Sequence, residues 1–343
     1  MTLRMIQVGM GGWGRNWTKN IVSENKDVEL VACVDISPEM LALAQAELSL
    51  PASHCFTSLD DTLTQIDCDA VLVTAALAGH VPSALMALEA GKHVLLEKPF
   101  ASTLAEAQRV VETADRSKRI LMISQNYRYY PAVQAVKELV REGELGPVGS
   151  VALDFRYDAN KAPYDPKGSH YNLWQPLLVD MAIHHFDLMR YVLGQNALSV
   201  TCQTWNPAWS NFREDAEGAA IITFDGGTVV SYRGSWVSPG PRTSWAGEWH
   251  MACEGGEVVW SSRDNVLPDS VTLRPSEKRT RHLKLPDYPD KDRHGSLRAF
   301  VEAVTTGQQP ESSGRDNLKT LALMLSAVES AQSGKPIHVT EVD

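Results

Sequence analysis

Residues 3–14, Leu-Arg-Met-Ile-Gln-Val-Gly-Met-Gly-Gly-Trp-Gly, decide the fold of this chain. The apolar run Leu3–Val8 predicts a buried strand, and a G-x-G-x-x-G pattern follows it at the start of a predicted helix. In such a loop Gly9 permits the tight turn, Gly11 lets the backbone approach a pyrophosphate, and Gly14 permits close helix–strand contact. A structural glycine turn in another kind of α/β protein is the alternative. The dinucleotide interpretation assigns cofactor contacts to Gly9, Gly11, Gly12, Trp13 and Gly14.

An acidic residue lies where a dinucleotide-binding unit requires one. Asp35 follows Gly14 by 21 positions, at the end of the second predicted strand, where a carboxylate accepts hydrogen bonds from ribose hydroxyls. The next residues are Ile36 and Ser37, with no Arg to receive a 2′-phosphate, so the sequence favours NAD over NADP. Alternatively, Asp35 is only a turn residue before a helix cap at Ser37.

Short apolar runs alternate with helical patterns along the first third of the chain, which is typical of βαβ units and a parallel sheet. Trp13, Trp17 and Ile21 recur every four residues and predict one apolar stripe along the first helix. We therefore predict a doubly wound, Rossmann-type α/β domain over residues 1–125. Its strands are expected at Leu3–Val8, Val28–Val34, His54–Phe56, Ala70–Thr74, His93–Leu96 and Ile120–Ser124.

The pattern changes after residue 125. Runs rich in β-formers, broken by Gly, Pro, Asp and Asn, extend from about residue 198 to residue 285 and predict a large, mostly antiparallel sheet. Residues 126–343 are therefore expected to form an α+β domain for substrate binding and oligomerisation. Its helices are expected at Pro131–Glu142, Pro176–Leu193, Gly295–Thr306 and Arg315–Gln332.

Length and composition exclude several classes of protein. A chain of 343 residues suggests two domains of roughly 150 residues each. The net charge of −10, without a local Lys/Arg cluster, argues against a nucleic-acid partner. The five cysteines contain no C-x-x-C pair and are interpreted as reduced thiols. Neither a signal peptide nor an apolar run of about 18 residues is present, so we expect a cytoplasmic protein with no membrane partner.

A second group of candidate residues follows the later strands of the first domain. Glu97-Lys98-Pro99 lies at the carboxyl end of the fifth predicted strand, the edge at which open α/β sheets bind ligands. Thr74 and His80 lie on the same rim. We expect Thr74, His80, Glu97 and Lys98 to contact the cofactor. The alternatives are a solvated Glu–Lys pair at a strand end and a helix-start capping role for His80.

The predicted helix at 176–193 carries three polar residues on one face, Asp180, His184 and Asp187. A carboxylate beside an imidazole can orient the ring, and imidazole is suited to moving protons at neutral pH. A buried polar stripe that stabilises the helix is the alternative. A metal site of Asp180, His184 and His185 is disfavoured because His185 lies about 100° round the helix from His184. No metal is expected.

Several motifs together resemble the Gfo/Idh/MocA family of glucose–fructose oxidoreductases and inositol dehydrogenases. They are Gly9–Gly14, the string Gly-Lys-His-Val-Leu-Leu-Glu-Lys-Pro at 91–99, Asp180–Asp187, Gln125-Asn126-Tyr127-Arg128 and the closing segment 295–339. The sequence departs from the family at 174–179, Trp-Gln-Pro-Leu-Leu-Val, where members usually have a Gly-rich run, and at Ala75, where a Pro often follows the Thr.

The resemblance implies an NAD-dependent oxidoreductase that interconverts a secondary alcohol and a ketone on a sugar, inositol or related polyol. Lys98, Asp180 and His184 would form the catalytic set, with His184 as general acid/base, Asp180 orienting it and Lys98 polarising the substrate oxygen. A non-catalytic NAD-binding regulator and an NAD-dependent glycosidase are the alternatives. Substrate contacts are expected from Lys98, Asn126, Arg128, Tyr164, Trp174 and His184, with Tyr164 and Trp174 stacking on a sugar ring.

The second domain has few helices for a sheet of about eight strands, so one face of that sheet is expected to lack cover. Alternation sends side chains to both faces, and an apolar patch on the bare face would be buried against a second copy. We therefore expect a homodimer or a homotetramer, built as a dimer of dimers, through this sheet. The predicted strands contain the apolar residues Val229, Tyr232, Trp236, Trp249, Met251 and Trp260, and some of these are expected on the bare face.

Overall fold

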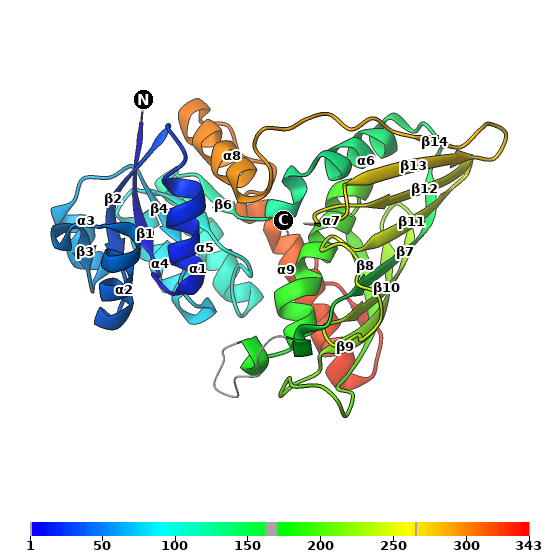
Figure 1. Ribbon diagram of the computed structural model, residues 1–343, viewed down its shortest axis with the longest axis horizontal. Coiled ribbons are helices and arrows are strands. Elements are labelled where there is room, and N and C mark those ends of the chain that lie inside the picture. The colour runs from blue at the N-terminus through cyan, green and yellow to red at the C-terminus, as the bar shows by residue number, and fades with distance from the viewer. Residues whose placement is uncertain (1, 162–169, 265, 343) are drawn as a thin grey trace. The chain divides into compact units, whose positions relative to one another are not determined.

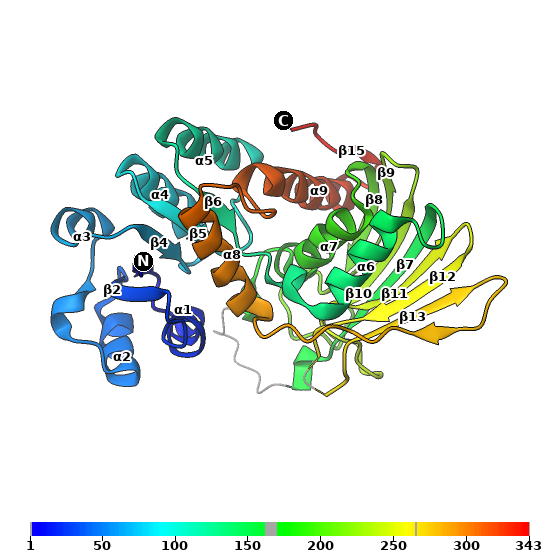
Figure 2. The ribbon, with the colours of Figure 1, turned by 90° about the horizontal axis from the view of Figure 1, so that it is seen from above.

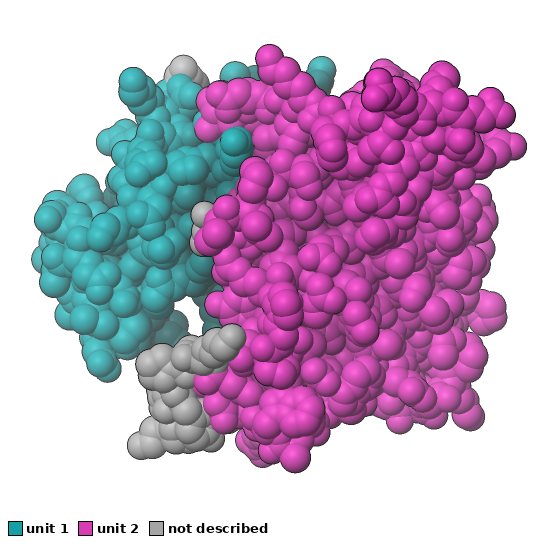
Figure 3. Space-filling model, turned by 45° about the vertical axis from the view of Figure 1, so that its right-hand side comes forward, with its two compact units in different colours: residues 1–126, 290–318 teal, residues 127–289, 319–343 magenta. Residues whose placement is uncertain are grey.

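The computed structural model describes residues 2–161, 170–264 and 266–342. The chain divides into two compact units, and each unit consists of two separate segments (Figure 3). Unit 1 comprises Met1–Asn126 and Asp290–Leu318, and unit 2 comprises Tyr127–Pro289 and Lys319–Asp343. No helix in the described part of the chain is long and apolar enough to cross a membrane.

Unit 1 contains a six-stranded parallel sheet, which confirms the predicted Rossmann-type domain. The strand order is β3-β2-β1-β4-β5-β6, so the direction of winding reverses between β1 and β4. At that point Val8 and Val73 are neighbours, and the loops that follow them diverge, as at the ligand site of doubly wound sheets. The strands are β1 Leu3–Val8, β2 Val28–Val34, β3 Cys55–Phe56, β4 Ala70–Val73, β5 His93–Leu96 and β6 Leu121–Ile123.

Crossover helices cover both faces of this sheet, with α1 and α2 on one side and α4 and α5 on the other (Figure 2). Ser37 caps α2 by accepting a hydrogen bond from the Met40 N–H, and Thr103 forms a capping box with Glu106 at the start of α5. The helices are α1 Gly12–Trp17, α2 Pro38–Leu48, α3 Leu59–Gln65, α4 Leu77–Glu89 and α5 Leu104–Ser117, with the 3₁₀ turn η2 Ala52–His54 before β3.

The apolar stripe predicted for the first helix is wrong at one position. Trp17 and Ile21 are buried, but 46% of Trp13 is exposed. Trp13 lies in the first turn of α1, within the Gly-rich pattern Gly9–Gly14. The helix then continues as the π-helix η1 Thr18–Val22, so its period lengthens beyond the 3.6 residues that the prediction assumed.

Residues 290–318 belong to unit 1, although they lie within the expected second domain. Helix α8 Asp292–Thr306 contacts β5 and η1, and the hydroxyls of Ser124 and Ser296 are hydrogen-bonded at 3.0 Å. The Ile123 N–H donates to the Ser312 carbonyl at 2.9 Å. These contacts join residues far apart in sequence, so no local pattern could reveal them. Helix α9 Gly314–Ser333 begins in unit 1 and continues into unit 2.

Unit 2 contains a nine-stranded sheet in the order β14-β13-β12-β11-β7-β10-β9-β8-β15 (Figure 1). Only β7 and β10 pair in parallel among these described strands, so the mostly antiparallel sheet is confirmed. The strands are β7 Val148–Arg156, β8 Ala197–Trp205, β9 Glu217–Phe224, β10 Val229–Ser235, β11 Glu248–Cys253, β12 Gly256–Ser261, β13 Ser270–Pro275, β14 Arg281–His282 and β15 Ile337–His338.

The helix predicted over 176–193 is present, but its first part is wound differently. Residues Pro176–Ala182 form the π-helix η6, and Ile183–Leu193 form the α-helix α7. Gly194 ends the helix in the left-handed conformation. The other helical segments are η3 Asn126–Tyr129, α6 Pro131–Glu142, η4 Ala159–Lys161 and η5 His170–Asn172.

The aromatic residues of β10, β11 and β12 lie on the covered face of the sheet, whereas Trp205 of β8 is 43% exposed. The bare face therefore carries less apolar surface than expected. Helices α6 and α7 lie against one face of the sheet (Figures 1 and 2). Of the six apolar residues, some of which were expected on the bare face, only Val229 is exposed, at 38%, and the other five are buried on the helix side. The five buried residues are Tyr232, Trp236, Trp249, Met251 and Trp260.

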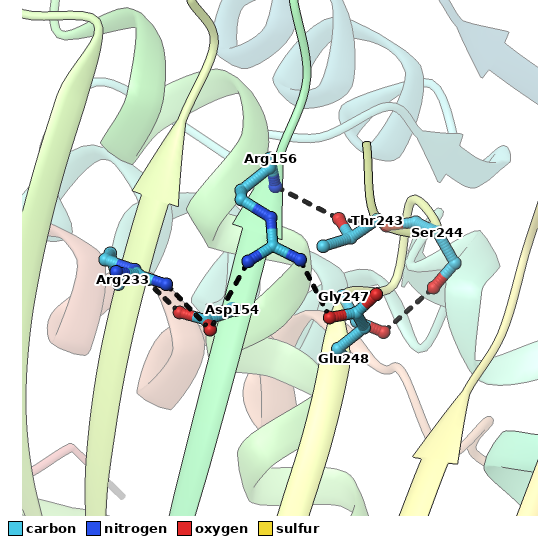
Figure 4. Close-up of polar contacts among 7 residues, drawn as sticks. All are labelled: Asp154, Arg156, Arg233, Thr243, Ser244, Gly247 and Glu248. Atoms are coloured by element: carbon cyan, nitrogen blue, oxygen red, sulfur yellow. Dashed lines mark hydrogen bonds and ion pairs between the residues drawn. The ribbon is translucent and has the colours of Figure 1, made fainter. Parts of the chain in front are cut away.

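Charged side chains occupy the opposite face (Figure 4). Arg233 of β10 forms two hydrogen bonds with Asp154 of β7, at 2.8 and 2.9 Å. Arg156 lies 3.9 Å from Asp154 and donates to Glu248 of β11 at 3.0 Å. Two cations and two anions thus alternate across three neighbouring strands.

Candidate active site

The Gly-rich loop is shaped partly by packing and partly by open space. Gly9 has φ +93°, and a Cβ there would collide with the backbone of Ala75. A Cβ on Gly14 would overlap the Gly9 carbonyl oxygen. A Cβ on Gly11 or Gly12 would meet nothing within 4 Å. Gly9 and Gly14 therefore permit the tight packing of the turn. Gly11 and Gly12 border open space, which is where a pyrophosphate would bind.

Asp35 and Thr74 both bond to this loop. The Asp35 carboxylate accepts hydrogen bonds from the Met10 N–H at 2.6 Å and from the Ser37 N–H at 2.8 Å. Each carboxylate oxygen can accept a second hydrogen bond, so these contacts leave capacity for a ribose hydroxyl. The buried Thr74 hydroxyl donates to the Gly9 carbonyl at 2.8 Å. Thr74 therefore supports the loop that is predicted to hold the cofactor.

Gln7 is a loop-supporting residue that the sequence analysis missed. It is completely buried in β1, and its amide donates to the Gly14 carbonyl at 2.8 Å and to the Thr74 hydroxyl at 3.1 Å. Its carbonyl accepts from the Thr18 hydroxyl at 2.7 Å. The available signal was an amide between the apolar residues Ile6 and Val8, since a buried polar group must find partners.

Glu97 and two tryptophans form a cluster beside the loop. The buried Glu97 carboxylate accepts from the Trp17 indole N–H at 2.7 Å and from the Lys98 N–H at 3.1 Å. Burial raises the pKa of Glu97, while the charge of Lys98 and the hydrogen bonds oppose that rise. The Arg293 guanidinium lies 4.3 Å from the centre of the Trp13 ring. Helix α8 thereby contacts the start of α1.

His80 holds two strand ends together. Its ring is buried, with Nδ1 2.8 Å from the Pro99 carbonyl oxygen and Nε2 3.0 Å from the Ala75 carbonyl oxygen. Burial lowers the pKa of His80, and these two hydrogen bonds oppose the shift. Both ring nitrogens thus bond to backbone after β4 and β5. The contact with Pro99 fixes the position of the turn that carries Lys98. The peptide bond between Lys98 and Pro99 is cis.

The helical segment 176–193 in unit 2 carries the other two predicted catalytic residues. Asp180 is half-buried in η6, and His184 lies in the first turn of α7. The neighbouring His185 is a core residue, with Nε2 2.9 Å from the Trp245 carbonyl oxygen and Nδ1 3.2 Å from the Tyr232 hydroxyl. Burial lowers the pKa of His185 to about 4, so this imidazole is neutral at physiological pH.

Asp187 and Arg128 form a buried ion pair. The Arg128 guanidinium donates to Asp187 through Nε at 2.7 Å and through Nη2 at 2.6 Å, and both side chains are at most 3% exposed. Thr320 of α9 donates to the same carboxylate at 3.1 Å and accepts from Arg190 at 2.8 Å. Arg128, expected to contact substrate, therefore binds a core carboxylate in this structure.

His184 stacks on Tyr127. The two ring centres are 4.0 Å apart and the ring planes differ by 4°. On the same tyrosine, the Arg263 guanidinium carbon lies 4.2 Å from the ring centre, and Nη1 donates to the phenol oxygen at 2.8 Å. Neither Tyr127 nor Arg263 was predicted as a site residue, because the contacts Arg263–Tyr127 and Tyr127–His184 depend on long-range packing.

The remaining substrate candidates lie in different surroundings. Trp174 is 44% exposed in the segment before η6, and Gln175 has φ +45°, a conformation that favours glycine. This is the place where the expected Gly-rich run is absent. Asn126, in unit 1, donates a hydrogen bond to the Asp292 carboxylate. Tyr164 lies outside the described residues.

Comparisons with known proteins identify relatives of similar sequence and fold. The chain is 26% identical to inositol 2-dehydrogenase of Rhizobium meliloti, over 99% of this chain and 100% of that protein. It is 25% identical to 1,5-anhydro-D-fructose reductase of Ensifer adhaerens, over 97% of each. An oxidoreductase from Agrobacterium radiobacter, solved in complex with NAD⁺, L-tartaric acid and magnesium, has the same fold, with a TM-score of 0.85 and 19% identity over 99% of each chain.

Two family models match the chain. The oxidoreductase family with an NAD-binding Rossmann fold matches residues 3–125, and the Gfo/Idh/MocA C-terminal domain matches residues 133–259. Together these matches span more than half of the sequence and confirm the resemblance noted from its motifs. The protein therefore belongs to the Gfo/Idh/MocA family of NAD-binding oxidoreductases.

Proposed function

We propose that this protein is an NAD-dependent dehydrogenase acting on a secondary hydroxyl, or the corresponding ketone, of a sugar, inositol or related polyol. In this proposal His184 exchanges a proton with the reacting hydroxyl, Asp180 orients the imidazole, and Lys98 donates a hydrogen bond to the substrate oxygen as charge develops there. The relatives named inositol 2-dehydrogenase and 1,5-anhydro-D-fructose reductase support the substrate class.

The cofactor would be held by the residues at the β1–β4 edge of the unit 1 sheet. Open space beside Gly11 and Gly12 fits the pyrophosphate, and Asp35 has acceptor capacity for the adenosine ribose. Trp13, Glu97 and Lys98 lie on the turns that follow β1 and β5 and are proposed to line the nicotinamide end. NAD supplies the acceptor or donor of the hydride when it is bound.

The main observation behind the proposal is that the polar residues of segment 176–193 differ in their surroundings. His185 is bonded into the core and neutral, and Asp187 is paired with Arg128. These two residues stabilise the helix through core contacts, which is the structural role that was the alternative for the polar residues of this helix. Asp180 and His184 are a second carboxylate–imidazole pair on the same segment, and His184 stacks on Tyr127. That separation supports a chemical role for the second pair.

A panel of polyols tests the activity directly. The purified protein would be incubated with NAD and with inositols, aldoses, anhydrosugars or sugar acids, and NADH formation would be followed by absorbance at alkaline pH. We expect net NADH production with at least one member of the panel. Cleavage of aryl glycosides without net NADH would instead indicate a glycosidase. NAD binding without turnover of any substrate class, in either direction, would contradict the proposal and favour a regulator.

Cofactor preference gives a separate prediction. Asp35 would repel a 2′-phosphate, and no Arg follows it to compensate. We expect kcat/KM with NAD to exceed that with NADP at least about tenfold, which corresponds to about 1.4 kcal/mol. Asp35→Ser should reduce this ratio, mainly by improving NADP binding. The measurement is steady-state kinetics with both cofactors, and equal efficiency of the wild-type protein with both would contradict the assignment.

The cysteines support a reducing compartment, and we place the protein in the cytoplasm. Cys33 and Cys55 are register neighbours on β2 and β3, yet both are free thiols. Burial raises the pKa of Cys33 to about 12, so this thiol is protonated and unreactive.

We also propose that the uncovered sheet face of unit 2 binds a second copy of the chain. Small side chains such as Ala152 and Ser231 lie at the centre of that face, and Ile221 is 51% exposed on it. The alternating charges of Figure 4 balance one another, so two copies can meet without net repulsion. A two-fold axis would make such an interface self-complementary.

Sedimentation equilibrium at micromolar concentration tests this assembly. We expect a mass of about two or four times the 37.7 kDa chain. Ile221→Asp should shift the population toward monomer by burying a charge, whereas Val266→Asp, at an exposed position outside the strands, should not. A wild-type monomer would show that the face remains solvated.

A further inference from the structure

Arg263 touches the tyrosine on which the proposed acid/base histidine stacks, although it lies 136 residues from that tyrosine in sequence. Its guanidinium carbon is 4.2 Å from the centre of the Tyr127 ring, and Nη1 donates to the phenol oxygen at 2.8 Å. The His184 ring contacts the same tyrosine in a nearly parallel stack at 4.0 Å. The guanidinium thus contacts the phenol ring, and the phenol ring contacts the imidazole.

The backbone of Arg263 is held in place from both sides. Its N–H donates to the Asp269 carboxylate at 2.9 Å, and its carbonyl accepts from the Trp245 N–H at 2.9 Å. The other Asp269 oxygen accepts from Ser262 at 2.8 Å and from the Ala132 N–H at 3.4 Å. Ala132 is the second residue of α6, and this helix begins shortly after Tyr127. Asp269 therefore fixes Arg263 against the segment that carries Tyr127.

Arg263 also has a backbone conformation that its residue type disfavours. Its φ is +62°, in the left-handed region, where a side chain clashes with the backbone and glycine is preferred. Such conformations persist where the surrounding structure requires them, and they concentrate at functional sites. The side chain of Arg263 thus occupies a corner where glycine would fit the backbone better.

We propose that Arg263 is a positioning residue for the reaction, fixing the Tyr127 ring and, through that ring, the plane of the His184 imidazole. The inference rests on the proposed role of His184 as acid/base. A fixed ring plane keeps one imidazole nitrogen directed toward the reacting hydroxyl, and small errors in such an orientation are costly in rate.

The guanidinium also acts on the charge of the imidazole. A nearby cation disfavours a second positive charge, so Arg263 should make His184 less basic. Among the described groups, Arg128 and Asp187 neutralise each other and His185 is neutral, whereas Asp180, Asp264 and Asp269 are acidic and oppose the effect of Arg263. The charged or titratable groups on the segments around His184 include Asp180, His185, Asp187, Tyr127, Arg128, Arg263, Asp264 and Asp269.

The Arg263→Gly variant removes the guanidinium without straining the backbone, so it tests the side chain alone. Glycine adopts φ +62° without strain, and this relief opposes the loss of the Tyr127 contacts, so the melting temperature should change little. With the guanidinium removed, we expect kcat to fall about tenfold while KM for NAD is unchanged. Guanidinium ion added well below denaturing concentration should restore part of kcat. The His184 resonance, one of ten histidines and identified by its loss in His184→Ala, should titrate about 0.5 unit higher by NMR.

Arg242→Met is the matched control. Arg242 pairs with Asp264, the residue after Arg263, at 3.0 Å, so its loss disturbs the same loop. We expect normal kcat and an unchanged His184 titration in this variant. An equal loss in both variants would assign the effect to loop stability and overturn the proposal. Normal kcat and an unshifted His184 in Arg263→Gly would also overturn it.

The two failures can be told apart. Loss of activity in His184→Ala together with normal Arg263→Gly would refute only the positioning role. Near-normal turnover in His184→Ala would refute the proposed function, and with it any role of Arg263 in the reaction. The NMR titration needs no substrate and measures the effect of Arg263 on the imidazole in either case.

Discussion

Replacing His184 by Ala should lower kcat by a factor of about 100 or more, because a general acid/base contributes on that order to proton transfer. Lys98→Ala should have an effect of similar size, since it removes the donor to the developing oxyanion. Both variants should leave the affinity for NAD nearly unchanged, as measured by titration of protein fluorescence. His282→Ala, on the exposed strand β14, provides a histidine control and should keep full activity.

The turnover of the His184→Ala variant decides whether His184 has a catalytic or a structural role. The ring stacks on Tyr127, so its loss could destabilise the fold, and the melting temperature should be recorded for each variant. Near-normal turnover in His184→Ala, with the substrate found by the polyol panel, would return Asp180 and His184 to the role of a buried polar stripe. A tenfold or smaller loss in Lys98→Ala would limit Lys98 to binding.

Asp187→Ala should strongly destabilise unit 2, by about 3–5 kcal/mol, because it leaves the Arg128 guanidinium buried without its counterion. Urea unfolding followed by tryptophan fluorescence is the measurement. Of the nine tryptophans, the seven from Trp174 to Trp260 all belong to unit 2, so the signal mainly reports that unit.

A double replacement provides the critical comparison. Arg128→Met combined with Asp187→Leu removes both charges at once and should recover most of the lost stability, since an apolar pair of similar volume avoids the desolvation penalty. Arg315→Ala, which removes one partner of an exposed pair with Asp115, should change the unfolding midpoint little. Full stability in Asp187→Ala alone would mean that water or another group replaces the carboxylate.

The sequence predicts the nucleotide-binding sheet well because the relevant signals are local. A strand of two to seven residues, a Gly-rich turn and a Ser or Thr cap are each contained in a short window, and β1 to β6 lie where the alternation places them. The fate of individual polar residues is harder to predict. Asp35 and Thr74 lie at the expected edge, but they bond first to the loop itself.

The errors share a cause in long-range packing. The position of Arg128 just after the domain junction favours a substrate contact, yet its partner Asp187 lies 59 residues further along the chain. The face to which β10 sends Tyr232 depends on which side the helices occupy, and no strand pattern contains that information. The π-helical winding of η1 and η6 escapes prediction for a different reason, because periodicity arguments assume a constant turn.

The late return of the chain to unit 1 has a consequence for its synthesis. Leu318, the last residue of that unit, leaves the ribosome 192 residues after Asn126. At about 5–20 residues per second this is a delay of roughly 10–40 s, during which β5 and η1 lack the helix that covers them. The nascent nucleotide-binding unit is therefore incomplete while most of unit 2 is being made. A fragment that ends at Asn126 stays in that incomplete state permanently.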